Sequence, residues 1–237
     1  MSKPIELIPL TRLAIAFLPV LVVVVFLIRW SLDAGTAIYG IARMLIQLLL
    51  IGYVLTFIFE THNSLLVVGV LSLMLAIASC IALRPIRKKK KGHYGKVLVS
   101  IAIGGVPTLV LITQGVLNLK PWFDPSKMIP LAGMIFANCM TAISLDADRY
   151  YAEWPQVEHC VARNTAFRAA LIPITNSLFA VGLVSLPGMM TGQIVIGADP
   201  LAAARYQIMV MCMLYGSSGI SVVSYMTFIK HGGTESG

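Results

Sequence analysis

Few side chains in this sequence could do chemistry, because only 12% of its 237 residues are charged. The most informative charge is Arg43, which stands inside an apolar stretch. Gln47 follows four residues later, so the two side chains would share one face of a helix. Ionisable residues inside a membrane segment usually face the interior of a helix bundle. Arg43 and Gln47 are therefore candidates for a polar stripe along a transport pathway; alternatively, Arg43 lies near the membrane surface and extends its guanidinium there.

A second set of candidate pathway residues consists of uncharged polar side chains in otherwise apolar stretches. Asn138 and Thr141 share a helix face, and Asn176 follows Pro173 in the next apolar stretch. Their oxygens could bind a substrate, or they could form hydrogen bonds between helices. The sequence leaves both interpretations open.

A candidate gate lies within residues 169–198. This run is uncharged and would measure about 45 Å as one helix, which is longer than a bilayer core requires. Proline and glycine must interrupt this run, and we expect an irregular or half-helical segment up to Pro200. Such backbone at membrane depth is tolerated where it is buried or lines a cavity; an apolar surface loop is the alternative. The candidate gate residues are Pro187, Gly188, Met189, Met190 and Gln193.

No arrangement of residues predicts an enzyme. The sequence lacks the phosphate-binding P-loop pattern, the serine nucleophile elbow and the zinc-protease helix. Asp146 and Asp148 could be paired acids, but side chains two positions apart on a helix face away from each other. Glu158, His159 and Cys160 are consecutive and cannot converge on one metal ion from a regular helix. We therefore predict no catalytic residues and no bound cofactor in this chain, and the metal ligands stay unknown.

The composition identifies the elements that must position these residues. Hydrophobic residues make up 58% of the chain, and the mean hydropathy is +0.86. The charged fraction of 12% is about half of the roughly 25% that a soluble domain carries. Crossing the hydrocarbon core takes about 20 apolar residues in a helix. The sequence therefore predicts an all-α, polytopic integral membrane protein with a single domain of about seven transmembrane helices over residues 1–237. The predicted spans cover residues 13–28, 37–59, 63–83, 97–119, 128–145, 169–186 and 206–229.

The basic residues predict the orientation. Seven of the eighteen lie between Arg84 and Lys96 without an intervening acid, so this loop, residues 84–96, is expected in the cytoplasm. That anchor places the N-terminus outside and the C-terminus inside. It also makes residues 146–168 the longest cytoplasmic connection, with Glu153, Glu158, Arg163 and Arg168 as a candidate contact surface for a soluble partner. The basic residues from Arg84 to Lys91 have no aromatic residue among them, so we expect this loop to contact the lipid bilayer and not nucleic acid.

One tract carries a family resemblance. Ala170–Met211 reads ALIPITNSLFAVGLVSLPGMMTGQIVIGADPLAAARYQIMVM, which resembles the signature of the FetB-type ABC transporter permeases, bacterial iron-export permeases with relatives in plant aluminium tolerance. Arg43–Phe59 and Met128–Leu145 resemble the second and fifth spans of the same family.

The resemblance implies a multi-pass permease of the bacterial inner membrane that exports iron or another metal ion. ATP and magnesium would be bound by a separate soluble P-loop ATPase subunit, and the permease would act as a homodimer. The segment before Ala170 is shorter than in the family, and it carries Asn164 and Thr165 where the family has a motif that we take to contact the ATPase. The alternative is an orphan permease or membrane binding protein that is uncoupled from an ATPase and has a non-metal substrate.

Overall fold

The computed structural model describes residues 9–60, 63–84, 92–154 and 156–232, and leaves the side chains of residue 10, 52–60 and 230–232 undescribed. The described residues are almost entirely helical, which confirms the predicted all-α fold. They divide into two compact units, residues 1–62 and residues 63–237. Five of the seven residues in the basic run, Arg87 to Lys91, lie outside the described residues.

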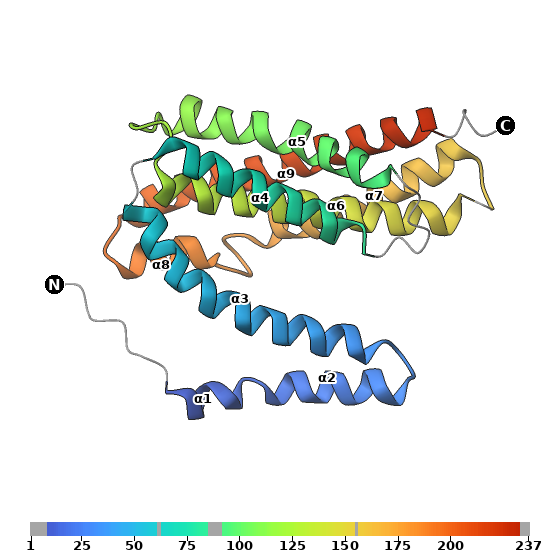
Figure 1. The fold of residues 1–237 in the computed structure, drawn as a ribbon, viewed down its shortest axis with the longest axis horizontal. Helices are drawn as coiled ribbons and strands as arrows, with labels where there is room; N and C mark the ends of the chain where they lie inside the picture. Colours follow the sequence, from blue (N-terminus) through green and yellow to red (C-terminus); the bar gives the residue numbers. More distant parts are fainter. Residues whose placement is uncertain (1–8, 61–62, 85–91, 155, 233–237) are drawn as a thin grey trace. The chain divides into compact units, whose positions relative to one another are not determined.

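The first unit consists of α1 (Leu10–Ile15), α2 (Leu18–Arg29) and α3 (Ala34–Glu60) (Figure 1). Asp33 begins α3: its carboxylate accepts hydrogen bonds from the Thr36 backbone N–H, at 3.0 Å, and from the Thr36 hydroxyl. None of the described side chains in this unit is buried. This is the pattern of helices that present apolar side chains to lipid on most of their surface.

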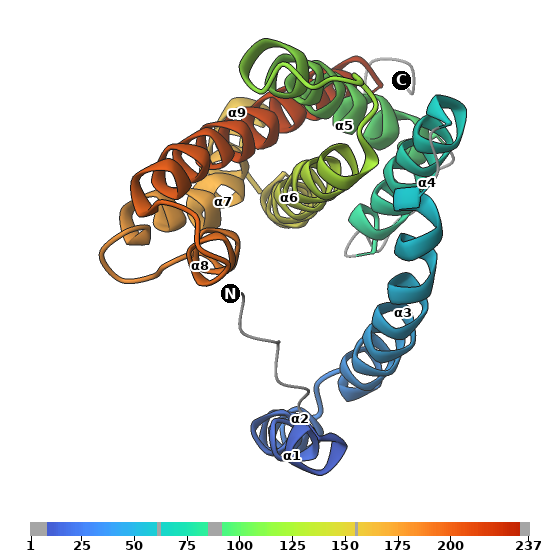
Figure 2. The ribbon, with the colours of Figure 1, turned by 90° about the vertical axis from the view of Figure 1, so that its left-hand side faces the viewer.

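The second unit is a bundle of long helices around α6. Viewed along the helices, α6 lies between α4, α5, α7 and α9 (Figure 2). Its largest fully buried apolar side chains come from α5, α6 and α9 and include Ile101, Leu131, Ile135, Ile143 and Met213. The elements are α4 (Ser64–Ala82), α5 (His93–Val110), the π-helical continuation η1 (Leu111–Val116), α6 (Pro125–Glu153), α7 (His159–Ala180), α8 (Gly188–Val195) and α9 (Pro200–Gly232).

Six helical segments within the described residues are long and apolar enough to cross a membrane, in agreement with about seven predicted spans. Each overlaps a predicted span. The predicted span without a counterpart among the six is 169–186. The six segments are Thr11–Arg29, Ala34–Ile51, Ser64–Ala82, His93–Val116, Pro125–Glu153 and Pro200–Ile229.

The span predicted at 169–186 ends earlier than expected. Helix α7 starts ten residues before Ala169, takes in two arginines, and stops at Ala180. There Val181 turns to extended backbone, and Gly182 adopts a φ of +86°, which favours glycine over other residues. The next helix, α8, begins after Pro187, so the half-helical segment expected before Pro200 is present.

Residues 146–168, which were predicted to form the longest cytoplasmic connection, are mostly helical. Helix α6 continues past Leu145 to Glu153, and α7 already begins at His159. The extension stays helical because Asp146 and Tyr150 are buried against the bundle, and because Arg149 pairs with Glu153 one turn later at 2.6 Å. Residues 154–158 alone connect the two helices.

Helices α5 and α9 approach each other closely at Gly104. A Cβ atom added there would lie 2.6 Å from the Ser217 carbonyl oxygen and would also overlap the Ser221 side chain. Small residues let helix backbones come into contact in membrane proteins. The space available at this crossing therefore requires glycine at position 104.

Candidate functional site: a buried polar cluster and an adjoining cavity

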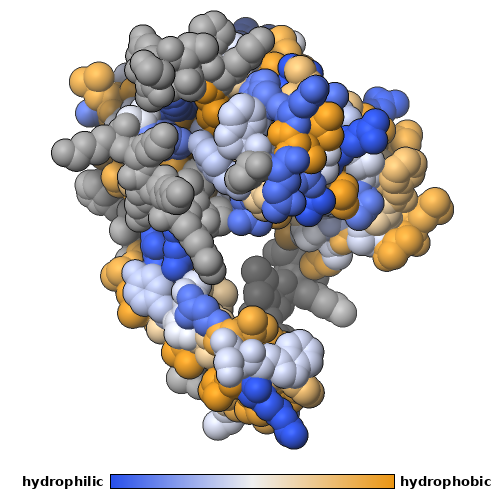
Figure 3. Space-filling model, turned by 90° about the vertical axis from the view of Figure 1, so that its right-hand side faces the viewer, coloured by the Kyte–Doolittle hydropathy of each residue, from blue (hydrophilic) through white to orange (hydrophobic). Residues whose placement is uncertain are grey.

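One end of the second unit, which we call the polar end, brings together the ends of five helices and gathers polar and titratable side chains. Hydrogen bonds tie its elements together. The Ser144 hydroxyl donates to the Ala82 carbonyl at 3.1 Å, and His93 Nε2 lies 2.7 Å from the Tyr151 hydroxyl. Figure 3 looks onto this end and shows hydrophilic residues gathered there. The polar end comprises the end of α4 at Ala82, the start of α5 at His93, the end of α6 at Glu153, the start of α7 at His159 and the end of α9.

Asp146 is a buried acidic residue of this region. Its side chain is 0% exposed, and neither carboxylate oxygen has a hydrogen-bond partner among the described residues. The described residues also hold no ion pair that includes Asp146. A buried, unpaired carboxylate is costly, so its presence inside a bundle points to a role beyond packing.

Tyrosine and histidine side chains surround Asp146. Tyr150, Tyr151 and Tyr225 all interact electrostatically with the Asp146 carboxyl group. Tyr150 then connects to α7, because its hydroxyl lies 2.8 Å from Nδ1 of His159. The Tyr150 ring also stacks on Trp154, with ring centroids 5.7 Å apart, and meets the His159 ring edge to face. These ring contacts fix the orientation of the Tyr150 side chain between Asp146 and His159.

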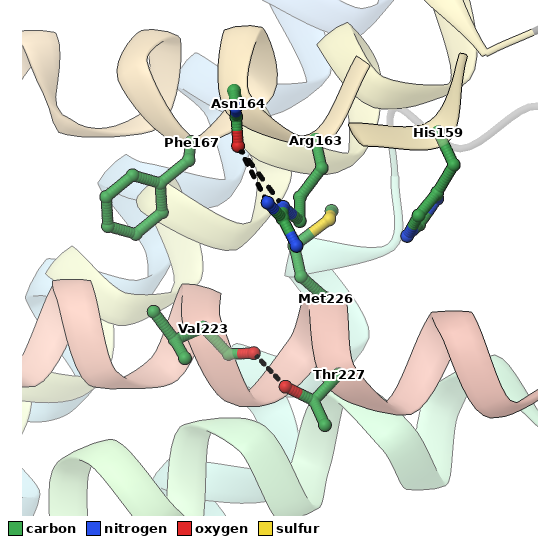
Figure 4. A pocket seen from close by; sticks show the side chains of 7 residues that line it. All are labelled: His159, Arg163, Asn164, Phe167, Val223, Met226 and Thr227. Atoms are coloured by element: carbon green, nitrogen blue, oxygen red, sulfur yellow. Dashed lines mark hydrogen bonds between the residues drawn. The ribbon is translucent and has the colours of Figure 1, made fainter. Parts of the chain in front are cut away.

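A cavity of about 410 Å³ lies between α7 and α9 at the same end (Figure 4). Its α7 wall contains His159, Arg163, Asn164 and Phe167. The Arg163 guanidinium is held by Asn164, whose side-chain oxygen accepts hydrogen bonds from Nε and Nη2 at 3.2 and 3.0 Å. The opposite wall is formed by α9 residues Val223, Met226 and Thr227. The α9 wall therefore carries one hydroxyl group, that of Thr227, beside two apolar side chains, whereas the α7 wall carries an arginine and a histidine.

The predicted pair Arg43 and Gln47 lies in the first unit. Both side chains are on α3, Arg43 half-buried and Gln47 exposed. With the Gln47 amide oxygen turned toward it, Arg43 donates hydrogen bonds from Nε and Nη2 at 3.0 and 3.3 Å. The guanidinium is thus paired on its own helix. Its role in a pathway stays a prediction.

The other predicted pathway residues are distributed over three helices of the second unit. Asn138 and Thr141, on α6, donate to carbonyl oxygens of their own helix at 2.9 Å each, and Asn176 is exposed on α7. Pro187 precedes α8, which carries the remaining gate residues and packs against α9. The cavity at the polar end takes none of these residues into its wall. The described contacts leave their assignment to a gate as a prediction.

The predicted contact surface lies at the polar end. Glu153 closes α6 in its ion pair with Arg149, Glu158 is exposed and immediately precedes α7, and Arg163 lines the cavity. Arg168 is exposed further along α7. Three of the four residues are thus close to the junction of α6 and α7.

Sequence reasoning did not anticipate the cluster around Asp146. Asp146 was weighed only as a partner of Asp148, which is exposed. The useful signal was the helical spacing: Cys139, Ile143, Asp146 and Tyr150 recur at intervals of three or four residues, and all four are buried. That spacing extends the buried face of the fifth span beyond the point where its hydropathy falls.

Comparison with known proteins places this helical membrane protein in a family. Residues 10–163 and 154–232 match a family described as "Uncharacterised protein family (UPF0014)". The chain belongs to this family. The sequence resemblance to FetB-type proteins is thereby confirmed.

Relatives match over most of the chain. The "Probable iron export permease protein FetB" of Escherichia coli K12 is 33% identical over 248 residues, 93% of this chain and 92% of FetB. The Arabidopsis thaliana "Protein ALUMINUM SENSITIVE 3" is 35% identical over 80% of this chain and 74% of the relative. "UPF0014 membrane protein STAR2" of rice is 32% identical over 94% of this chain and 80% of its own length. No solved structure matches the chain.

Proposed function

We propose that this chain is the membrane-spanning permease subunit of an ABC-type exporter that moves iron or another metal ion out of the cytoplasm. The observation that carries the proposal is the match to the E. coli protein named a probable iron export permease, which covers 93% of this chain. Six apolar helices support a permease, since such helices can enclose a path across lipid. The sequence contains no P-loop pattern, so a separate subunit must hydrolyse ATP with its magnesium.

The polar end is the surface that we assign to the partner ATPase. Arg84 and Lys96 are the first and last residues of the basic run; Arg84 follows the end of α4 and Lys96 lies at the start of α5, which supports a cytoplasmic position for this end. Glu158 and Arg163 then offer one acidic and one basic group next to the cavity between α7 and α9. A subunit that docks there could move α7 relative to α9 when it binds ATP. Two such permease subunits in the bacterial inner membrane would complete the transporter.

The transport path is proposed to lie within each permease, with Asn138, Asn176 and α8 as pathway or gate. The metal ion is the transported substrate in this proposal, so the pathway should bind it through weak ligands and not in a tight, permanent site. Binding must be strong enough for entry and weak enough for release. Amide oxygens and thioethers on separate helices meet that condition.

The decisive experiment joins purification to transport. We expect a soluble P-loop ATPase to co-purify with the full-length chain, and ATP to drive Fe²⁺ uptake into inside-out vesicles that contain both proteins. Arg163→Ala should weaken the association and lower ATP-driven uptake about tenfold, a coupling loss of about 1.4 kcal/mol. Arg205→Ala is the matched control, because Arg205 is an exposed arginine at the start of α9, far along the helix from the cavity.

Two outcomes would overturn this proposal. Metal transport that persists at full rate without any ATPase would establish an uncoupled permease. ATP-driven vesicles that move no Fe²⁺, Mn²⁺ or Zn²⁺ would remove the metal-ion cargo.

A further inference from the structure

The interface between α6 and α9 contains several buried polar atoms, and some of them have no hydrogen-bond partner among the described residues. Both oxygens of Asp146 and the Ser218 hydroxyl make no hydrogen bond to a described residue. The buried hydroxyls of Ser221 and Tyr225 have Cys139 and Tyr151, respectively, as polar neighbours. Ser218, Ser221 and Tyr225 are spaced three and four residues apart, so they line one face of α9. A bundle that needed only packing would be more stable with apolar residues at these positions.

We propose that Asp146 is a proton-binding site, and that it exchanges its proton with the cavity at the polar end through Tyr150 and His159. Proton exchange goes beyond the proposed transport of a metal ion and does not depend on it. Chains of acidic and histidine side chains inside membrane bundles are a recurrent way to move protons.

The set of donors favours a proton over a metal ion. Magnesium and calcium require six or more oxygen ligands, and zinc takes four ligands of nitrogen, sulfur or oxygen. The described residues hold no group of three or more histidine, cysteine, aspartate or glutamate side chains that could bind a metal. A proton needs only one basic oxygen, and Asp146 supplies it.

The groups that face Asp146 from each neighbouring helix are compatible with this assignment. On α6 itself they are Tyr150 and Tyr151, and on α9 it is Tyr225. Helices α5 and α7 contribute histidines, which reach the cluster by hydrogen bonds to Tyr151 and Tyr150. Helix α4 has no acidic or basic residue. No described arginine or lysine pairs with Asp146 and would hold it permanently charged.

Two histidines, His93 and His159, form hydrogen bonds with tyrosines of the cluster, but they differ in their position relative to the cavity. His159 forms part of the cavity wall, whereas His93 does not. Nδ1 of His159 is engaged with Tyr150, and Nε2 is buried without a hydrogen-bond partner. Nε2 is therefore the atom that can accept a proton when water in the cavity approaches it. Tyr150 lies one helical turn from Asp146, on the same face of α6.

The exchange moves one proton from water in the cavity to Asp146 in three transfers. Nε2 of His159 takes a proton from a water molecule in the cavity, and Nδ1 releases its own proton to the Tyr150 oxygen. The Tyr150 hydroxyl proton passes to the Asp146 carboxylate after the Asp146 side chain, which makes no hydrogen bond to a described residue, rotates toward Tyr150. Asp146 becomes neutral, the water becomes hydroxide, and Tyr150 and His159 keep their charges.

Infrared spectroscopy of the full-length protein in lipid nanodiscs tests the proposal without substrate or ATPase. We expect a carbonyl stretching band of a protonated carboxyl group that changes with pH and is absent in Asp146→Asn. In D₂O, this band should shift as the proton exchanges for deuterium. Tyr150→Phe and His159→Gln should keep the band and slow the shift about a hundredfold, the low end of what a positioned proton-transfer group contributes.

Matched variants make the result specific. Asp148→Asn alters an exposed acid two residues away and should leave both the band and its exchange rate unchanged. If Asp146→Asn does not fold, Asp146→Glu should move the band without abolishing it. A band that survives Asp146→Asn, or no pH-dependent band at all, would overturn the proton site. An exchange rate that is unaffected by both Tyr150→Phe and His159→Gln would overturn the route. Neither result bears on whether the protein exports a metal ion.

Discussion

The two units of this protein use apolar side chains in opposite ways. In the second unit, Ile135 and Ile143 are 0% exposed and are enclosed by neighbouring helices. In the first unit, Leu49 on α3 is 72% exposed, and no described side chain is buried. Both sets of helices are apolar enough to cross a membrane. Hydropathy thus identifies what can lie in lipid, but it does not distinguish a helix surrounded by lipid from one that encloses a core.

The polar residues also differ between the two units in whether other helices surround them. Arg43 in the first unit is paired with Gln47 on its own helix, so the pair needs no other element. Asp146 in the second unit is buried among side chains from other helices and has no hydrogen-bond partner in the described part of the chain. Among the described residues, the buried carboxyl group without a hydrogen bond thus lies in the unit where several helices surround it. The following substitutions test this contrast, beginning with the largest expected effect.

Gly104→Ala should be the most damaging small substitution in the second unit. The added methyl group would lie 2.6 Å from the Ser217 carbonyl oxygen, which belongs to the backbone of α9 and cannot rotate away. We expect the free energy of unfolding to fall by about 3 kcal/mol, the upper part of the usual range for overpacking. Thermal denaturation of the purified protein in detergent, followed by circular dichroism, measures the change.

Gly40→Ala is the matched control in the first unit. An added Cβ at Gly40 meets no atom within 4 Å, and the residue lies inside α3. Alanine is favoured over glycine in a helix by about 1 kcal/mol, so this variant should be unchanged or slightly more stable. Equal losses at the two glycines would contradict the difference between the units.

Ile135→Ala should destabilise the second unit by about 3 kcal/mol, because it removes buried methyl and methylene groups and leaves a cavity on α6. Leu49→Ala, in the first unit, should cost less than about 0.5 kcal/mol, since no described neighbour encloses that side chain. Chemical unfolding by SDS titration in mixed micelles would give both values. A Leu49→Ala loss as large as that of Ile135→Ala would mean that α3 has a packed partner.

The sequence predicts the membrane spans well because a span depends on local composition. Each of the six helices suited to crossing a membrane overlaps a predicted apolar stretch. The ends of the helices were harder to predict. Hydropathy falls at Asp146, yet α6 continues to Glu153 because the neighbouring helices bury Asp146 and Tyr150. Tertiary packing, which hydropathy does not record, determines where this helix ends.

The candidate site was predicted only in part for a related reason. The spacing of Arg43 and Gln47 is local, and the structure pairs the two side chains. The cavity depends on side chains from α7 and α9, which are separated by about sixty positions in the chain, from Arg163 to Val223. Tyr150 and His159 are nearer in sequence, but their hydrogen bond requires the chain to reverse between α6 and α7. Contacts of this kind need the fold itself.

The smallest expected effect concerns the carboxylates that begin two helices, Asp33 in the first unit and Asp124 in the second. Asp124 accepts hydrogen bonds from the Ser126 backbone N–H and hydroxyl, at 3.1 and 2.6 Å, and pairs with Lys127 at 3.4 Å. The bond from the Ser126 side chain is the main reason that the pKa of the Asp124 carboxyl lies below its ordinary value. Folding therefore favours the charged form of Asp124. Its contribution to stability is present above the ordinary aspartate pKa of about 4 and is lost as the pH falls through the lower pKa of the folded state.

Asp124→Asn isolates this charge, because asparagine begins a helix about as well as aspartate. At pH 7 the variant should lose less than about 1 kcal/mol, as expected for a partly exposed ion pair. Between about pH 5 and pH 3 its melting temperature should fall less steeply than that of the parent protein. Asp33→Asn is the corresponding substitution in the first unit. If unfolding at low pH begins in the second unit, Asp124→Asn changes how the melting temperature falls with decreasing pH, and Asp33→Asn does not. The reverse result would place the acid-sensitive step in the first unit, where no core holds the helices together.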